Sequence, residues 1–204
     1  MITMLYCRKI MPSYFPKQSP NKSARSKEIY MEKDILLLQK TDLFKNLTTE
    51  QIKTLLCICR KVTFTENEII MQEGDLGDSL YIILTGTVEV IKSLVINDLS
   101  EDDSQEAVKN KVFTKIDEKS HAVFGEIALL EECKRTATIR ANSNCILYEI
   151  KKDDFLQLVE TNCALGCKIL LNLAKIVSAR LRKADEDTIK LTTVLSIVLR
   201  ESGS

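Results

Sequence analysis

Two β-rich segments in the middle of the chain restrict its possible folds more than any other part. Residues 80–84 and 87–91 are dominated by aliphatic, aromatic and β-branched side chains, and Thr85 and Gly86 separate them. Two such runs joined by a short glycine-containing turn are the pattern of a β-hairpin. This pattern predicts an antiparallel β fold, and further strand-like runs occur at residues 61–64, 69–71, 112–116 and 145–150.

Amphipathic helices are predicted before this β-rich region. A first stretch begins after residue 31 and precedes a break at residues 41–42. A second helix is expected to begin at Thr48, because Thr48 and Gln51 have the spacing of a capping box. Both helices would pack on a sheet.

Two more helices are predicted after the last strand. Asp153 and Asp154 are candidate caps for a short helix over residues 155–159. A longer helix from residue 162 carries an apolar stripe, and residues 189–199 form a further apolar run that needs a partner surface if it is helical. The stripe consists of Leu165, Ile169, Leu170, Leu173, Ile176, Val177 and Leu181.

The charges and cysteines limit the classes of function. Lys plus Arg equals Asp plus Glu at 29 each, so no overall field attracts nucleic acid or a membrane surface. The seven cysteines are scattered and odd in number, which indicates reduced thiols and a cytoplasmic location. Cys57 with Cys59, and Cys163 with Cys167, are spaced like metal pairs, but the chain has a single histidine. Packing thiols are therefore favoured and no metal is expected. No run reaches the roughly 18–20 apolar residues that cross a bilayer.

A length of 204 residues allows one domain with extensions. Residues 1–30 hold all three prolines and an excess of basic side chains, so a flexible basic arm is expected there. A solvated tail is favoured over a contact with an acidic partner or a transit peptide. The main domain is assigned to residues 31–184, followed by a helical extension at 185–204. Residues 94–111 are polar and are expected to form a long surface loop.

A stretch at residues 124–130, followed by Arg135, has the composition of an anion site. Gly125 permits a close backbone turn, and residues 127–130 favour one helical turn whose first amides lack intrahelical acceptors. The guanidinium of Arg135 can bind a phosphate through two hydrogen bonds. The carboxylate of Glu126 would repel that ligand unless it met a donor such as a ribose hydroxyl. The set therefore indicates a nucleotide with one anionic group and a free sugar hydroxyl.

The run FGEIALL at residues 124–130, with RTATIR at residues 135–140, resembles the phosphate-binding cassette of the cyclic nucleotide-binding domain family. The run GDLGDSLYIILTGTVEV at residues 74–90 is similar to the middle of that family's barrel. The resemblance extends over about residues 43–182 and implies that residues 31–184 form a cyclic nucleotide-binding domain. It implies an α+β, mainly β fold: an antiparallel double-stranded β-helix, or jelly-roll barrel, flanked by N-terminal helices and long C-terminal helices.

The resemblance also implies a role for the residues of the cassette. Arg135 would pair with the cyclic phosphate, and Glu126 would hold the ribose 2′-OH. Thr136 would add its hydroxyl to the phosphate site, and residues 177–180 of the long helix would meet the purine. The implied phosphate-binding amides are those of Gly125, Ile127 and Ala128. The implied ligand-binding set is Phe124, Gly125, Glu126, Ile127, Ala128, Arg135, Thr136 and Ala137.

Two segments depart from the family's compact pattern. One is the polar segment at residues 94–111, and the other is residues 117–121, where many relatives have a glycine-rich turn. His121 would make binding pH-sensitive if it lay near the pocket, but a surface or packing histidine is favoured. Thr136 resembles both cyclic GMP-preferring members and bacterial cyclic AMP receptors, and cyclic AMP is favoured.

The leading hypothesis is a stand-alone cyclic nucleotide receptor without enzymatic activity. It would signal through its C-terminal helices to an unknown effector protein and form a homodimer through the same helices. The alternative is a structural protein that keeps the fold, joins Glu126 to Arg135 in an internal ion pair and binds nothing. A role in nucleic-acid regulation is disfavoured, because the charges balance and the residues after Lys183 are too few for a DNA-reading module.

Overall fold

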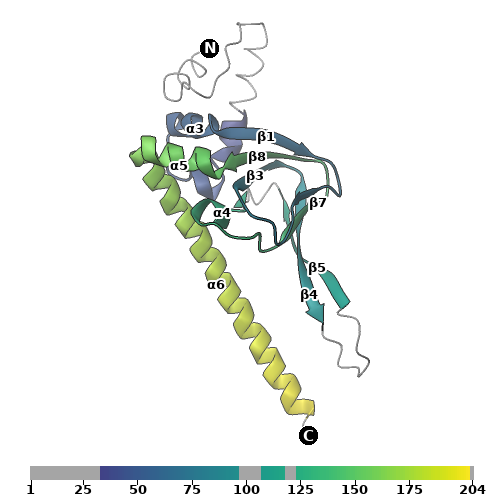
Figure 1. The fold of residues 1–204 in the computed structure, drawn as a ribbon. Helices are drawn as coiled ribbons and strands as arrows, with labels where there is room; N and C mark the ends of the chain where they lie inside the picture. Colours follow the sequence, from purple (N-terminus) through teal and green to yellow (C-terminus); the bar gives the residue numbers. More distant parts are fainter. Residues whose placement is uncertain (1–32, 97–106, 118–122, 203–204) are drawn as a thin grey trace.

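The computed structural model describes residues 33–96, 107–117 and 123–202, whose strands form two four-stranded antiparallel sheets (Figure 1). In the first sheet the order is β1 (Cys59–Phe64), β8 (Cys145–Lys151), β3 (Ser79–Thr85) and β6 (Val123–Phe124). In the second sheet the order is β2 (Ile69–Met71), β7 (Thr138–Ala141), β4 (Thr87–Ile96) and β5 (Ala107–Asp117).

The predicted antiparallel β architecture with flanking helices is confirmed. Within the described ranges, however, no strand ladder joins the two sheets. The closure into a jelly-roll barrel that the family resemblance implied is therefore not confirmed.

The predicted hairpin at Gly86 is wrong, although both of its segments are strands. β3 pairs with β6 and β8, whereas β4 pairs with β5 and β7. Gly86 has a φ of +92°, and a Cβ there would lie 2.5 Å from the backbone oxygen of Asn144. The turn therefore requires glycine and carries the chain from one sheet to the other. A strand-turn-strand pattern does not show which sheet the second strand joins.

The strands β4 and β5 form the hairpin that the structure does contain, and it is longer than predicted. The backbones of Leu94 and Ile96 pair with those of Lys109 and Ala107. The expected surface loop at residues 94–111 is therefore wrong at both of its ends, and residues 97–106 lie outside the described ranges. Extending a ladder satisfies backbone N–H and C=O groups even where the sequence is polar.

An apolar core lies between the two sheets. Tyr81 and Ile83 of β3 contribute to it from the first sheet, and Val88 and Ile139 contribute from the second. Leu80, Ile82 and Leu84 of β3 belong to a different core on the other face of the first sheet. β3 is thus buried on both faces, as its almost uninterrupted apolar sequence allows.

The second core is covered by helices. They comprise residues 33–38, the short 3-10 helix η2 (Asp42–Phe44), α3 (Thr49–Leu56), α5 (Lys152–Thr161) and the first half of α6 (Cys163–Ser202). The capping box at Thr48 and Gln51 is confirmed, with both reciprocal hydrogen bonds present. The caps predicted at Asp153 and Asp154 are wrong, because Lys151 is the N-cap of α5. Both acids lie in the first turn, where the helix dipole favours negative charge.

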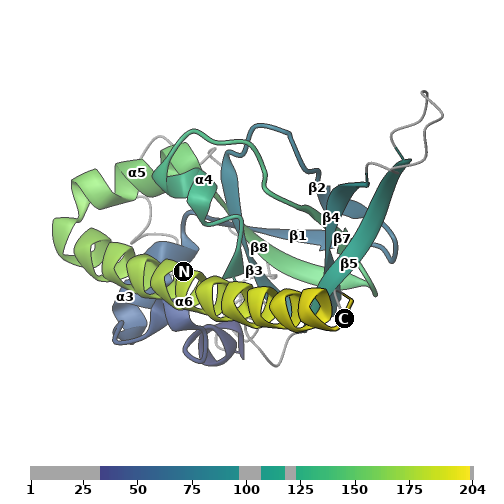
Figure 2. The same ribbon diagram turned by 90° about the horizontal axis from the view of Figure 1, so that it is seen from below.

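Helix α6 is one continuous helix of 40 residues. Its apolar stripe is confirmed over the first half, where Leu165, Ile169 and Leu173 are fully buried beside α5 and η2. Residues 178–200 are exposed, and this half extends past the sheets in the same direction as the β4–β5 hairpin (Figure 1). Viewed from below, α5 lies beside the first turns of α6 only (Figure 2). The predicted boundary between the main domain and the helical extension, at residues 184–185, falls inside this helix.

The cysteines differ in state. Cys59, Cys133, Cys145, Cys163 and Cys167 are free thiols, whereas Cys57 is disulfide-bonded. The expectation of seven reduced thiols is therefore wrong at Cys57. In the described part of the chain, no three His, Cys, Asp or Glu residues are grouped as metal ligands. No helix among the described residues is long and apolar enough to span a membrane.

Candidate functional site

A cavity of about 260 Å³ lies where the segment from β6 to β7 meets the second sheet and α6. All eight residues of the predicted ligand-binding set line it. Its remaining wall is largely apolar, and apart from Arg180, which falls in the range 177–180 expected near the purine, this part was not predicted from the sequence. The additional lining residues are Met71, Val90, Thr114, Ile116, Cys133, Lys134, Ile139 and Arg180.

Arg135 is 8% exposed, although its side chain carries a permanent charge. Its Nη2 donates to Ser79 Oγ at 3.0 Å, and its Nη1 donates to the Gly125 carbonyl at 3.4 Å. Both acceptors are neutral, and no described carboxylate forms an ion pair with this guanidinium. Asp78 acts on Arg135 only at longer range. Because a guanidinium has five N–H donors, three remain for a ligand.

Backbone contacts fix the position of Arg135. Its amide donates to the Asp75 carbonyl at 2.7 Å, and its carbonyl accepts from the Gly74 amide at 2.9 Å. The loop before β3 thus holds the segment before β7. Two glycines then leave room for the side chain: a Cβ at Gly125, whose φ is +76°, would lie 2.7 Å from Nη1, and a Cβ at Gly77 would lie 3.0 Å from Nε.

Glu126 does not pair with Arg135. Its carboxylate forms an ion pair through Oε1 with Arg180 of α6, whose guanidinium also donates to the Val123 carbonyl. The internal Glu126–Arg135 pair of the alternative hypothesis is therefore wrong. Sequence reasoning placed residues 177–180 near the purine but did not identify the bond between Arg180 and Glu126, because an arginine on an exposed helix face carries no signal of its partner.

The second oxygen of Glu126 takes no part in the ion pair with Arg180. Glu126 lines the cavity and is 4% exposed, and Oε2 has no hydrogen-bond partner among the described residues. A carboxylate oxygen at this position can accept a hydrogen bond from a ligand hydroxyl.

The one-turn helix predicted after Glu126 is confirmed as α4 (Ile127–Leu130). Ile127 and Ala128 line the cavity at its beginning, and Leu129 packs into the core beneath. His121, which could have made the site pH-sensitive, lies outside the described residues.

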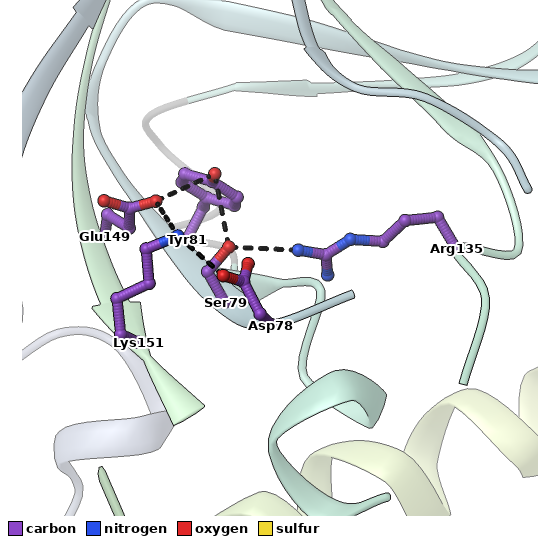
Figure 3. Close-up of polar contacts among 6 residues, drawn as sticks. All are labelled: Asp78, Ser79, Tyr81, Arg135, Glu149 and Lys151. Carbon is purple, nitrogen blue, oxygen red and sulfur yellow. Dashed lines mark hydrogen bonds and ion pairs between the residues drawn. The ribbon is translucent and has the colours of Figure 1, made fainter. Parts of the chain in front are cut away.

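Behind Arg135, a series of polar groups leads away from the cavity (Figure 3). Ser79 Oγ donates to Tyr81 Oη at 3.3 Å, and Tyr81 Oη donates to Glu149 Oε1 at 3.1 Å. Lys151 lies 3.4 Å from Glu149 and 2.9 Å from Asp78. The hydrogen bond from Lys151 lowers the pKa of Asp78, and the same bond raises the pKa of Lys151. Burial raises the pKa of Tyr81, which therefore keeps its proton.

The part of the chain that forms this cavity is similar to known proteins. Residues 61–162 match the family described as "Cyclic nucleotide-binding domain". A cGMP-dependent protein kinase of Eimeria tenella is 32% identical over 127 residues, covering 62% of this chain and 11% of the kinase. The cAMP-dependent protein kinase regulatory subunit of Candida albicans is 29% identical over 122 residues, covering 60% of this chain and 23% of the subunit.

A solved structure supports the same relationship. The crystal structure of a cyclic nucleotide-binding domain from Methylobacillus flagellatus has a TM-score of 0.62 and 25% identity, covering 78% of this chain and 83% of that chain. The chain spans less than a quarter of the length of the two curated relatives. The segment that matches the family makes up half of the chain, and the chain therefore belongs to the cyclic nucleotide-binding domain family.

Proposed function

We propose that the cavity binds a cyclic nucleotide, with Arg135 pairing with the cyclic phosphate. The observation that carries this proposal is a buried guanidinium that lines a cavity and whose acceptors among the described residues are all neutral. A buried charge without a counter-ion is costly, and an anionic ligand would supply one. Charge-assisted hydrogen bonds from guanidinium to phosphate are also the strong class of hydrogen bond.

The rest of the cavity suits the rest of such a ligand. Glu126 Oε2 would accept from the ribose 2′-OH, while Oε1 stays with Arg180. The apolar side chains of Val90, Ile116 and Ile139 would face the sugar and the purine. Thr136 would add a hydroxyl to the phosphate site. Cyclic AMP is the favoured ligand over cyclic GMP.

Helix α6 would transmit the effect of ligand binding to a partner protein. Arg180 connects α6 to the carboxylate that we assign to the ribose, so occupancy of the cavity and the position of α6 depend on a shared group. A ligand shifts such a helix only by the difference in its affinity for the two arrangements. The domain would act as a regulatory module without chemistry of its own, passing this change to an effector protein.

The exposed half of α6 would pair with a second copy. Leu181, Thr188 and Leu195 recur every seven residues, and Leu191 and Val198 lie at the intermediate positions. This spacing is typical of the seam of a two-stranded coiled coil. The leucines and the valine are more than half exposed in the single chain, and pairing would bury them.

Isothermal calorimetry with cyclic AMP, cyclic GMP and linear 5′-AMP tests the proposal. The parent protein should bind a cyclic nucleotide and prefer it to 5′-AMP. Arg135→Ala should lose about 2–5 kcal/mol of binding, roughly 30-fold or more in affinity. Arg140→Ala is the matched control: Arg140 pairs with the buried Glu89 but does not line the cavity, so its loss should lower stability and leave affinity unchanged. Parent protein that binds neither cyclic nucleotide would refute the assignment.

A further inference from the structure

Ser79 accepts the shorter of the two hydrogen bonds that the Arg135 guanidinium donates, yet it does not line the cavity. Its side chain is buried, with 1% of the residue exposed, at the start of β3. Tyr81, two residues later on the same strand, is 8% exposed and also does not line the cavity. Neither hydroxyl therefore lies in the cavity wall, and Arg135 is a lining residue to which Ser79 is directly hydrogen-bonded.

The hydrogen bonds behind Arg135 start from a fixed donor. The guanidinium can only donate, so Ser79 Oγ must accept from it and direct its own hydrogen elsewhere. Ser79 donates to Tyr81, and Tyr81 donates to Glu149; the Asp78 carboxylate also hydrogen-bonds Ser79 and is a second acceptor beside it. An ionised carboxylate can only accept, so it ends the series. Each bond polarises the next, which strengthens the acceptor that Ser79 presents to Arg135.

The far end of this series is held in place. Glu149 and Tyr81 are cross-strand neighbours in the β3–β8 ladder, which sets the separation of the two side chains. The ring of Tyr81 stacks on Phe124, with centroids 5.4 Å apart, and Phe124 itself lines the cavity directly before Gly125. Lys151 supports Glu149 from the outer side.

We propose that Ser79, oriented by Tyr81 and Glu149, is the positioning residue that holds the Arg135 guanidinium ready for a phosphate. The proposal rests on the proposed function as far as the ligand is concerned. The series fixes Nη2 on Ser79 and turns the remaining donors of the guanidinium toward the cavity. A pre-organised arginine binds an anion more tightly, because less side-chain entropy is lost on binding.

The affinity test compares two buried tyrosines. Tyr81 and Tyr148 are both 8% exposed, and each donates its hydroxyl to a carboxylate, but Tyr148 contacts Asp34, away from Arg135. Tyr81→Phe should weaken cyclic nucleotide binding about threefold, and Ser79→Ala about tenfold. Tyr148→Phe should leave affinity unchanged. Equal losses for the two tyrosine variants, or an unchanged affinity in Ser79→Ala, would overturn the proposal.

A double-mutant cycle separates positioning from a general structural role. Lysine has no guanidinium for Ser79 to hold. In an Arg135→Lys background, adding Ser79→Ala should therefore cause little further loss of affinity. Additive losses would mean that Ser79 acts on the ligand by another route. Circular dichroism and thermal unfolding verify that each variant is folded.

A third measurement needs no ligand. In the ¹⁵N-arginine NMR spectrum of the ligand-free protein, Arg135 should give separate, slowly exchanging Nη signals, identified by their absence in Arg135→Lys. These signals should merge in Ser79→Ala and persist in Tyr148→Phe. Merged signals already present in the parent protein would overturn the positioning proposal, whatever the protein binds. Distinct signals in a protein that binds neither cyclic nucleotide would instead count against the proposed function alone.

Discussion

At the scale of single residues, the site depends on how closely the backbone approaches one arginine. Arg135 is surrounded by groups that are small or lack a side chain: Gly77, Gly125 and Ser79. This crowding holds the guanidinium in one place without neutralising it. The positive charge of Arg135 therefore has no carboxylate partner among the described residues, because close packing rather than an ion pair fixes the position of its side chain.

The closeness at Gly77 leads to a prediction. A Cβ there would lie 2.6 Å from Ala128 Cβ and 3.0 Å from Arg135 Nε, so Gly77→Ala should push α4 and the arginine apart. We expect a loss of about 1–3 kcal/mol in the free energy of unfolding. Cyclic nucleotide affinity should fall as well. Thermal unfolding and calorimetry measure the two effects.

Gly166→Ala is the matched control for that variant. Gly166 lies near the start of α6, and an added Cβ would lie 2.8 Å from Val159 Cα of α5, so the substitution is also crowded but lies outside the cavity lining. It should lower stability by about 1–3 kcal/mol and leave affinity unchanged. If Gly166→Ala reduced affinity as much as Gly77→Ala, the steric explanation would be wrong.

At the scale of elements, α6 divides into two halves with different roles. Its first half is buried against α5 and η2, where Asn172 also donates to the carbonyls of Leu43 and Lys45. Its second half is exposed from residue 178 onward. Arg180 lies at the beginning of that exposed half and bonds to Glu126 and Val123 of the cavity segment. Helix α6 is therefore connected to the cavity segment at the point where its packing against α5 and η2 ends.

Removal of this connection should uncouple the exposed half of α6 from the ligand. Arg180→Ala leaves the buried Glu126 carboxylate without its partner, so we expect a loss of about 1–3 kcal/mol in stability. In the parent protein, cyclic nucleotide should change amide hydrogen exchange in residues 178–200. That change should be reduced in Arg180→Ala.

Arg182→Ala provides the comparison, since Arg182 is exposed on the same helix and does not line the cavity. Hydrogen exchange followed by mass spectrometry should show the same ligand-induced change in Arg182→Ala as in the parent. An undiminished change in Arg180→Ala would show that α6 senses the ligand by a different contact.

At the scale of the whole molecule, a compact two-sheet body carries a long helix whose outer half has a large apolar surface. Ile189, Leu191, Val194, Leu195 and Val198 are all more than half exposed. Contiguous apolar surface of this kind marks an interaction site. The seven-residue repeat favours a second copy of the same helix as the occupant.

Charges introduced on this repeat should produce monomers. A Leu191→Asp, Leu195→Asp double variant should sediment as a single chain at concentrations where the parent is a dimer, because a coiled-coil seam does not accommodate two carboxylates. Lys190→Glu lies off the seam and should remain dimeric. Sedimentation equilibrium distinguishes these outcomes, and a monomeric parent would exclude the dimer.

The sequence by itself determined the local features of this protein. The strands, the capping box at Thr48, the turn of helix after Glu126 and the glycine-arginine spacing of the cassette all depend on interactions between residues close in the chain. Local chemistry identified Gly125, Glu126 and Arg135 as site residues, and the family resemblance supplied the rest of the eight predicted residues, all of which line the cavity.

Only the tertiary structure decided which distant groups meet. It placed β3 and β4 in different sheets although they are adjacent in sequence, and it paired Glu126 with Arg180 rather than Arg135. It also set Ser79 behind the arginine, 56 residues away in the chain. Such pairings depend on the packing of whole elements, and a residue's type does not identify its partner when many groups could satisfy the same charge or hydrogen bond.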